Sequence, residues 1–207
     1  MNKYVLGCLG VAGVGVVFLI ILGIAAIAGY NNLVGLKNGV DAQWAEVQNQ
    51  YQRRADLIPN VVQTVSGAAN FEKSTLVEVT QARASVGQVK LDPSKAPTDP
   101  AQLRQFEAAQ GQLGNALSRL LVVSENYPSL KSNQNFLELQ AQLEGTENRI
   151  ATARNSFNES ARTYNTAVQS FPAVFYAGMM GFTSRPYFQG KEGSDIAPEV
   201  KFDFNKK

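Results

Sequence analysis

Hydrophobic residues occur in this chain in two different patterns. From Tyr4 to Gly29 the residues are almost all Val, Leu, Ile, Gly and Ala, and residues 4–36 include no charged side chain. About 20 helical residues cross a bilayer core, so residues 1–30 are predicted to form a transmembrane anchor that contacts membrane lipid through residues 4–29. Lys3 precedes the apolar stretch, and the positive-inside rule favours a cytoplasmic N-terminus and an extracytoplasmic body.

The same stretch has two other interpretations. Ala26-Ile27-Ala28 resembles the small-residue site of a cleaved secretory signal, and Val5-Leu6-Gly7-Cys8 resembles the lipobox of a lipoprotein. The apolar stretch is longer than the roughly 7–15 residues of a signal's apolar region. Almost all of it follows Cys8, where a lipoprotein would retain it. We therefore favour an uncleaved anchor.

Beyond the anchor, apolar residues recur every three or four positions, which is the period of an amphipathic helix. Four helices are expected: one that carries the stripe from Val40 to Val65, and others over residues 71–89, 100–125 and 132–171. Pro59 predicts a kink or short break near Leu57, because proline removes a helical hydrogen bond. Asp99 and Ser132 are the expected N-caps of the third and fourth helices.

The fourth helix carries the strongest periodic signal. Its apolar or small residues repeat about every 3.5 positions, which favours antiparallel partners of similar length. The prediction is an all-α fold, in which residues 31–172 form an elongated antiparallel bundle of about four helices. The stripe consists of Phe136, Leu139, Leu143, Thr146, Ile150, Ala153, Phe157, Ala161, Tyr164, Val168 and Phe171.

Residues 173–207 are predicted to form an apolar and then extended C-terminal tail. The apolar run over residues 171–182 is too short to span a bilayer. We favour its docking on the bundle, with the membrane interface or a contact between subunits as alternatives. The aromatic residues expected to make interactions are Phe171, Phe175, Phe182 and Phe188, and Val200, Phe202 and Phe204 are further candidate anchors.

Composition narrows the chemistry. Histidine is absent, Cys8 is the one cysteine, and the net charge is +2. These facts exclude histidine-based catalysis and zinc sites, a redox cysteine pair and an intrachain disulfide, and they argue against a nucleic-acid partner. The 16 asparagines and 16 glutamines are expected on solvated faces. We predict no enzymatic activity, catalytic residue, metal or cofactor.

A small set of charged residues stands out beside the apolar stripes. Glu147 and Arg154 are seven residues apart and share a helix face, which is expected to meet Arg54 or Asp56 near Pro59. The favoured interpretation is an ion-pair network that fixes helix register. The alternative is a charged groove that grips a peptide or another protein. The candidates are Arg53, Arg54, Asp56, Glu144, Glu147, Arg149 and Arg154.

Several motifs in order resemble the LemA family of bacterial membrane proteins. They are YQRRADLIPN at residues 51–60, LEGTENRIA at 143–151, and the tail motifs at 181–188 and 197–200. The chain departs at Phe157, where the family tends to carry Tyr, and at Thr183-Ser184, where Lys is common. The resemblance implies a single-pass or lipid-anchored protein with an all-helical extracytoplasmic domain and no established enzymatic activity. Neighbouring peptidase genes in the family suggest an envelope quality-control context.

Together these features predict a structural or interaction scaffold in the bacterial cell envelope. The long helical faces and the apolar tail would be presented to protein partners, including further copies of the chain in a homo-oligomer. The alternative is an accessory or adaptor subunit for a membrane peptidase.

Overall fold

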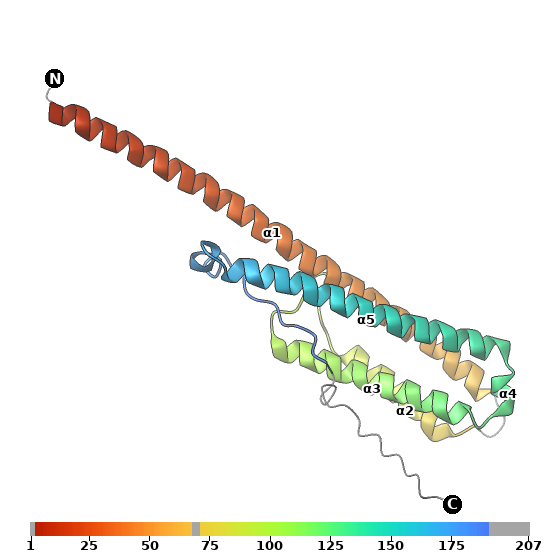
Figure 1. Cartoon of the computed structure of the whole chain (residues 1–207). Coiled ribbons are helices and arrows are strands. Elements are labelled where there is room, and N and C mark those ends of the chain that lie inside the picture. The colour runs from red at the N-terminus through yellow and green to blue at the C-terminus, as the bar shows by residue number, and fades with distance from the viewer. Residues whose placement is uncertain (1–2, 68–70, 191–207) are drawn as a thin grey trace, which may run out of the picture.

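The computed structural model describes residues 3–67 and 71–190, with side chains from residue 13 onward except those of Phe18 and Leu22. Within these residues the fold is all-α, as predicted. Four long helices, α1 (Lys3–Ser66), α2 (Lys73–Gln88), α3 (Pro100–Ser124) and α5 (Gln134–Gln169), run up and down in turn (Figure 1). Val200, Phe202 and Phe204 lie outside the described residues.

Helix α1 joins the apolar segment to the bundle without a break. Its 64 residues extend about 96 Å at 1.5 Å per residue. Of the two outcomes expected near Leu57, the short break is wrong, because the helix continues through Pro59 to Ser66, and the kink stays a prediction. Ile58 and Val61 are each 1% exposed on either side of the proline, so packing holds the helix together. Pro59 itself is on the exposed side.

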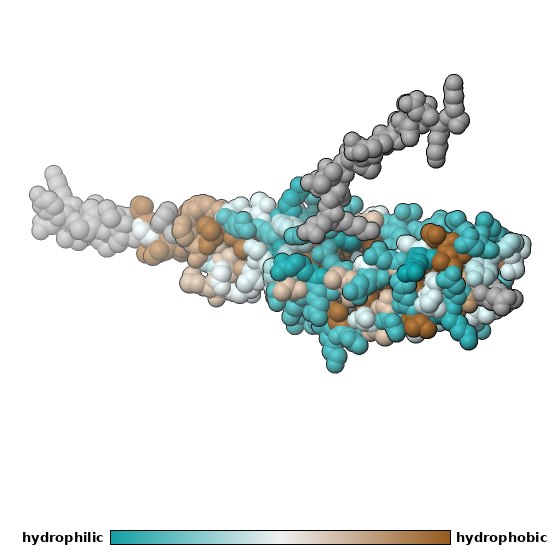
Figure 2. All heavy atoms as spheres, turned by 90° about the horizontal axis from the view of Figure 1, so that it is seen from below, coloured by the Kyte–Doolittle hydropathy of each residue, from teal (hydrophilic) through white to brown (hydrophobic). Residues whose placement is uncertain are grey.

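The N-terminal part of α1 projects beyond the bundle. From Gly13 onward it is long and apolar enough to cross a membrane, with a window of mean hydropathy 2.4 of which none is buried. Figure 2 shows these apolar residues emerging from a mostly hydrophilic body. This arrangement is the one expected of a membrane-spanning helix attached to a water-exposed domain.

The principal core lies where α5 packs antiparallel along α1. The buried residues of α5 follow the predicted stripe from Phe136 to Val168, with Leu139 half-buried. Trp44 of α1 is at the centre, with its ring centroid 5.6 Å from Phe106 and 5.7 Å from Phe157. Its indole N–H donates to the backbone oxygen of Asp92 at 3.0 Å, which ties the α2–α3 loop to the core.

Helices α2 and α3 form a hairpin that covers the other side of the core. Asp99 caps α3 as predicted, since its side chain accepts from the Ala101 N–H, and Pro100 occupies the first turn. The cap of α5 is Asn133, not Ser132. Ser132 instead ends the short helix α4 (Pro128–Lys131), whose presence moves the start of α5 by one residue.

The C-terminal segment returns along α5 after a turn. The turn contains the 3-10 helix η1 (Ala173–Phe175) and reverses at Gly181, whose φ of +79° favours glycine. Phe171 was expected at the end of the buried stripe, but it is 81% exposed. The expectation is wrong because α5 ends at Gln169, and the stripe ends with it.

Two asparagines of α5 hold the extended segment by its backbone. Asn165 accepts from the Arg185 N–H at 2.7 Å and donates to the Arg185 oxygen at 2.8 Å. Asn158 makes the same pair of bonds with Phe188, at 2.9 and 3.0 Å. Seven helical residues rise about 10.5 Å, and three extended residues cover about 10 Å, so the two repeats match.

The Arg185 side chain fixes the segment to α1 and to the loop before α3. It is 7% exposed, donates to the Ala96 oxygen at 2.6 Å and lies 3.6 Å from Asp41. Asp41 also accepts from the Ala96 N–H at 2.9 Å. Burial raises the pKa of the neighbouring Tyr164 phenol, although Arg185 opposes the shift. The contacts of Arg185 and Asp41 thus join α1, the loop before α3 and the extended segment.

The asparagine pairing predicts a local effect of Asn158→Ala. Removing the amide deletes both bonds to Phe188, and leaving buried backbone groups unpaired costs about 1–3 kcal/mol. Hydrogen exchange at the Phe188 amide should accelerate about tenfold or more, while the Arg185 amide, held by Asn165, keeps its protection. Asn155→Ala, at an exposed position of the same helix, is the matched control. Unchanged exchange at Phe188 would show that the pairing does not hold the segment.

Candidate functional site

A groove runs between α3 and α5 and has a volume of about 980 Å³. Helix α1 contributes Tyr51 and Arg54, and Gln189 and Gly190 border one part of the groove. Three arginines and three glutamates line it, together with apolar residues such as Leu117 and Leu143. The charges are therefore balanced, and the groove combines ionic groups with apolar surface.

Arg54 is the buried basic residue of the groove. Its place in the α1 stripe, between Tyr51 and Ile58, directs it inward, and it is 3% exposed. The guanidinium donates to Glu147 at 2.9 Å and to the Gln110 backbone oxygen at 3.2 Å, and also to the Gln110 side-chain oxygen. It lies 5.0 Å from the centre of the Tyr51 ring. One side chain of α1 thus connects α3 with α5.

A second ion pair joins α3, α5 and the extended segment. Arg154 donates to Glu107 at 2.7 Å and to the Gln189 oxygen at 3.0 Å. The Gln189 N–H donates to Glu107 at 3.3 Å, and the Arg154 guanidinium lies 4.6 Å from the centre of the Phe188 ring. Burial raises the pKa of the Glu107 carboxyl, against the opposing effects of Arg154 and the Gln189 N–H. Through the contacts of Gln189 with Arg154 and Glu107, the extended segment forms part of the groove wall.

Six of the seven predicted charged residues line one of two hollows in the structure. Arg54, Glu144, Glu147 and Arg154 all line the groove. Arg53 and Asp56 line a smaller hollow of about 390 Å³ instead, with Asp56 accepting from Gln52 at 2.7 Å.

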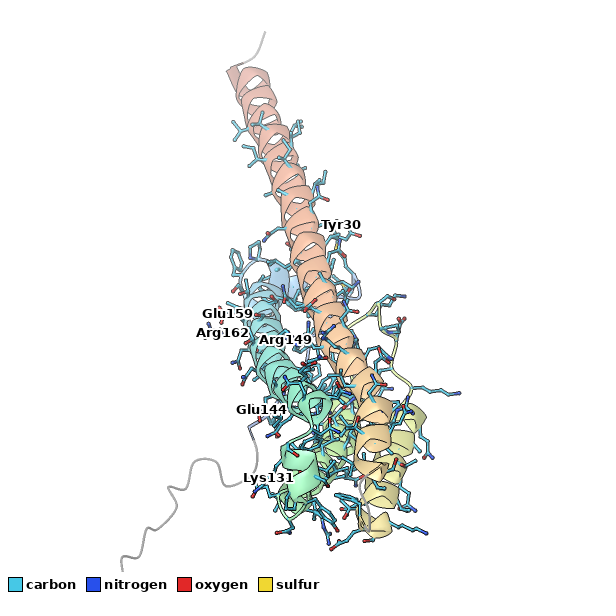
Figure 3. All side chains as sticks on the ribbon, turned by 90° about the vertical axis from the view of Figure 1, so that its right-hand side faces the viewer. Tyr30, Lys131, Glu144, Arg149, Glu159 and Arg162 are labelled. Carbon is cyan, nitrogen blue, oxygen red and sulfur yellow. The ribbon has the colours of Figure 1, made fainter. Side chains whose placement is uncertain are left out.

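Arg149 contributes to neither hollow. It reaches from α5 to Gln50 of α1 at 3.2 Å and to Thr146 at 2.9 Å. Figure 3 shows Arg149 and Glu144 on α5. Arg149 therefore belongs to the contact between α1 and α5.

The aromatic candidates also divide. Phe182 and Phe188 are buried, whereas Phe171 and Phe175 are exposed. The ring of Phe188 packs against Trp44 and Phe157, with centroid distances of 6.1 and 5.4 Å.

Sequence reasoning missed Glu107, Gln110, Asp41 and Arg185. A signal for Gln110 exists, because it occupies the same stripe of α3 as Phe106 and Leu113, where a polar residue requires a buried partner. No local pattern links Asp41 to Arg185.

Two of the three glutamates that line the groove take part in ion pairs. Glu107 and Glu147 both pair with guanidinium groups, at 2.7 and 2.9 Å, so each carboxylate is already engaged in a contact between helices. In the part of the chain that the structure describes, no group of three Asp, Glu, Cys or His residues could hold a metal ion. The arrangement offers matched charges and apolar contact to another molecule.

These features define a class: a helical bundle with a lateral groove, continuous with one membrane-compatible helix. The sequence pattern of the LemA family matches residues 43–202. The chain belongs to the LemA family and is a membrane-associated helical protein.

Several named relatives are similar over most of the chain. Magnetosome protein MamQ of Magnetospirillum gryphiswaldense is 30% identical over 189 residues, which cover 83% of this chain and 70% of that protein. Magnetosome protein MamQ 2 of Paramagnetospirillum magneticum is 29% identical with the same coverage. Protein LemA of Metamycoplasma hominis is 27% identical over 168 residues, covering 77% and 71%. None of these names denotes a reaction.

The neighbouring arginines of α1 provide a matched pair of variants. Arg54→Ala removes the buried partner of Glu147 and Gln110 and should lower the free energy of unfolding by about 3 kcal/mol. Arg53→Ala, at an exposed position, should change it by about 0.5 kcal/mol or less. Urea unfolding of the full chain in detergent, followed by the fluorescence of Trp44, the one tryptophan, measures both. Equal losses would contradict a structural role specific to Arg54.

Tyr51 predicts a dependence of stability on alkaline pH. Burial raises the pKa of its phenol above the ordinary value of 10.0, although Arg154 and Arg54 oppose the shift. The neutral phenol therefore stabilises the fold below the unfolded-state pKa of about 10, and this contribution is lost as the pH rises through the raised pKa. Above pH 10 the free energy of unfolding should fall more steeply in the wild type than in Tyr51→Phe.

Tyr30 is exposed, so Tyr30→Phe is the control. Unfolding is again followed by the fluorescence of Trp44. Identical alkaline slopes for the wild type and Tyr51→Phe would refute the assignment.

Proposed function

We propose that this protein is a membrane-anchored scaffold of the bacterial cell envelope that holds a segment of a protein partner in the α3–α5 groove. Residues 1–30 remain in the membrane as an uncleaved anchor with a cytoplasmic N-terminus, and the bundle of residues 31–172 is extracytoplasmic. The observation that carries the proposal is the continuity of α1, which passes from the apolar segment to Arg54 in one helix.

This continuity gives the groove a fixed place relative to the membrane. Arg54 lies about 37 Å along α1 from Gly29, at 1.5 Å per residue. No loop interrupts the helix between these residues. A partner in the groove would therefore be held at a defined distance from the bilayer, which is the physical property a scaffold requires.

The lining of the groove favours a protein segment as the occupant. Equal numbers of arginines and glutamates match a surface of mixed charge better than a polyanion. Gly111, Gly114 and Ser118 keep the α3 wall low, which leaves room for a backbone to approach. Arg54 is buried, so the lining charges that a partner can reach include the exposed Arg104 and Glu144.

A photoreactive amino acid in the groove tests this proposal in the native membrane. Placed at Ser118, an exposed lining position, it should form a covalent adduct with one partner protein, identified by mass spectrometry. Placed at Gln112, an exposed α3 position that does not line the groove, it should give little of the same adduct. Glu144→Lys should reduce the yield at Ser118, because it reverses a charge at the rim.

The identity of the adduct separates the functions. A single non-peptidase partner supports the scaffold, a second copy of the chain supports self-assembly, and a membrane peptidase supports the adaptor role. Equal adducts at Ser118 and Gln112 would show that the groove is not the binding site.

A further inference from the structure

The turn after α5 exposes a group of apolar side chains that the bundle does not use. Residues 170–182 contain no charged side chain. Ala173, Ala177 and Phe182 are buried and fix the turn to the bundle. The exposed apolar members, with their exposed fractions, are Phe171 at 81%, Val174 at 52%, Phe175 at 72%, Met179 at 85% and Met180 at 50%. We call residues 171–180 the apolar turn.

The apolar turn lies at one defined level of α1. The Phe182 ring packs edge-on against Tyr30, with centroids 5.5 Å apart. The hydroxyl of Tyr176 lies directly against Gly29, where a Cβ atom would meet it. Gly29 and Tyr30 are the residues at which the long apolar stretch of α1 ends. Figure 1 shows the turn at the end of α5 beside α1, and Figure 3 shows Tyr30 near this end of the bundle.

This level is where a membrane-spanning helix leaves the hydrocarbon core. The apolar stretch that ends at Gly29 is long enough for a core about 30 Å thick. Aromatic side chains are enriched at the boundary between headgroups and acyl chains. Surface-bound apolar segments insert about 5–10 Å at this boundary. The exposed side chains of the apolar turn therefore occur at the depth at which lipid stabilises them.

We propose that the apolar turn is a second membrane contact, which inserts Phe171, Phe175 and Met179 into the interface of the leaflet that α1 enters. The proposal rests on retention of α1 as the membrane anchor. The turn would attach the protein to the membrane at a second point, away from the axis of α1. With two points of attachment, the protein could not rotate freely about that axis. The bundle would then present the groove in one orientation to the membrane, as well as at one distance.

The size and position of the patch favour lipid over a protein as its occupant. Five exposed side chains on one turn are few compared with the roughly 20–30 residues that each partner contributes to a standard protein interface. The patch also lies near the uncovered apolar surface of α1, because Tyr176 contacts Gly29, and Ile24 and Ile27 just before it are 63% and 65% exposed. One bilayer covers both surfaces.

Site-directed spin labelling of the full chain tests the depth of the turn. Cys8→Ser removes the one native cysteine, and single labels are then attached through Met179→Cys in the turn, Ile20→Cys in the span and Ser129→Cys at the other end of the bundle. The protein is reconstituted in vesicles of equimolar phosphatidylcholine and phosphatidylglycerol. Collision rates with oxygen, which enters lipid, and with a water-soluble nickel complex are measured for each label.

The expected result is an oxygen-to-nickel collision ratio several-fold higher at residues 179 and 20 than at residue 129. A lipid-like ratio at residue 20 with an aqueous ratio at residue 179 overturns the second contact and leaves the anchor intact. An aqueous ratio at residue 20 overturns the anchor and the turn together. A label at residue 179 that neither reagent reaches shows that a protein surface covers the turn, which also overturns the proposal.

Discussion

The packing of α5 along α1 is the constraint on which the rest of the structure depends. Both helices bury a continuous stripe in the contact, and the fully buried Trp44 and Phe157 meet at its centre. Because α5 is antiparallel to α1, its C-terminal end returns toward the apolar segment. The N-terminal half of α5 lies at the other end of the contact and lines the groove. The same contact therefore determines where the exposed turn lies and where the charged wall of the groove stands.

Arg54 contributes specificity to this contact at an energetic cost. Burying a guanidinium removes it from water, a cost that its partners repay only with good geometry. Here the partners come from two different helices, Gln110 of α3 and Glu147 of α5. A shift of either helix by one turn would move a partner by about 5.4 Å and leave the charge unpaired. The buried arginine therefore favours one register of α3 and α5 against α1, and that register defines the groove.

The helices could be predicted from sequence because their signals are local and agree with one another. The stripe of α5 and the Asp99 cap of α3 each depend on residues within a few turns. Pro59 suggested a break because proline removes a helical hydrogen bond. Packing of the buried Ile58 and Val61 outweighs this cost, and that packing cannot be deduced from the neighbouring sequence. Ser132 misled because α4 uses it as a C-cap. Phe171 misled because its spacing from Val168 fits the sequence period, although the helix and its buried stripe end before it.

The groove could be predicted only in part. The spacing of Glu147 and Arg154 places both on one face of α5, and the sequence leads us to expect that this face meets Arg54 or Asp56. In the structure Arg54 donates to Glu147. The separation of α3 from α5 could not be deduced, because it depends on how two helix pairs pack. The pairing of Arg185 with Asp41 joins residues far apart in the sequence. Only the path of the extended segment brings them together.

The extended segment links the apolar turn to the wall of the groove. It leaves the apolar turn at Phe182, is held at Arg185 by Asn165 and at Phe188 by Asn158, and reaches Glu107 and Arg154 in the groove wall at Gln189. An extended chain fixed at three successive points has little freedom to lengthen or shorten. The position of the turn beside α1 and the position of the groove wall are therefore set by the same eight residues, 182–189, and neither can move far without the other.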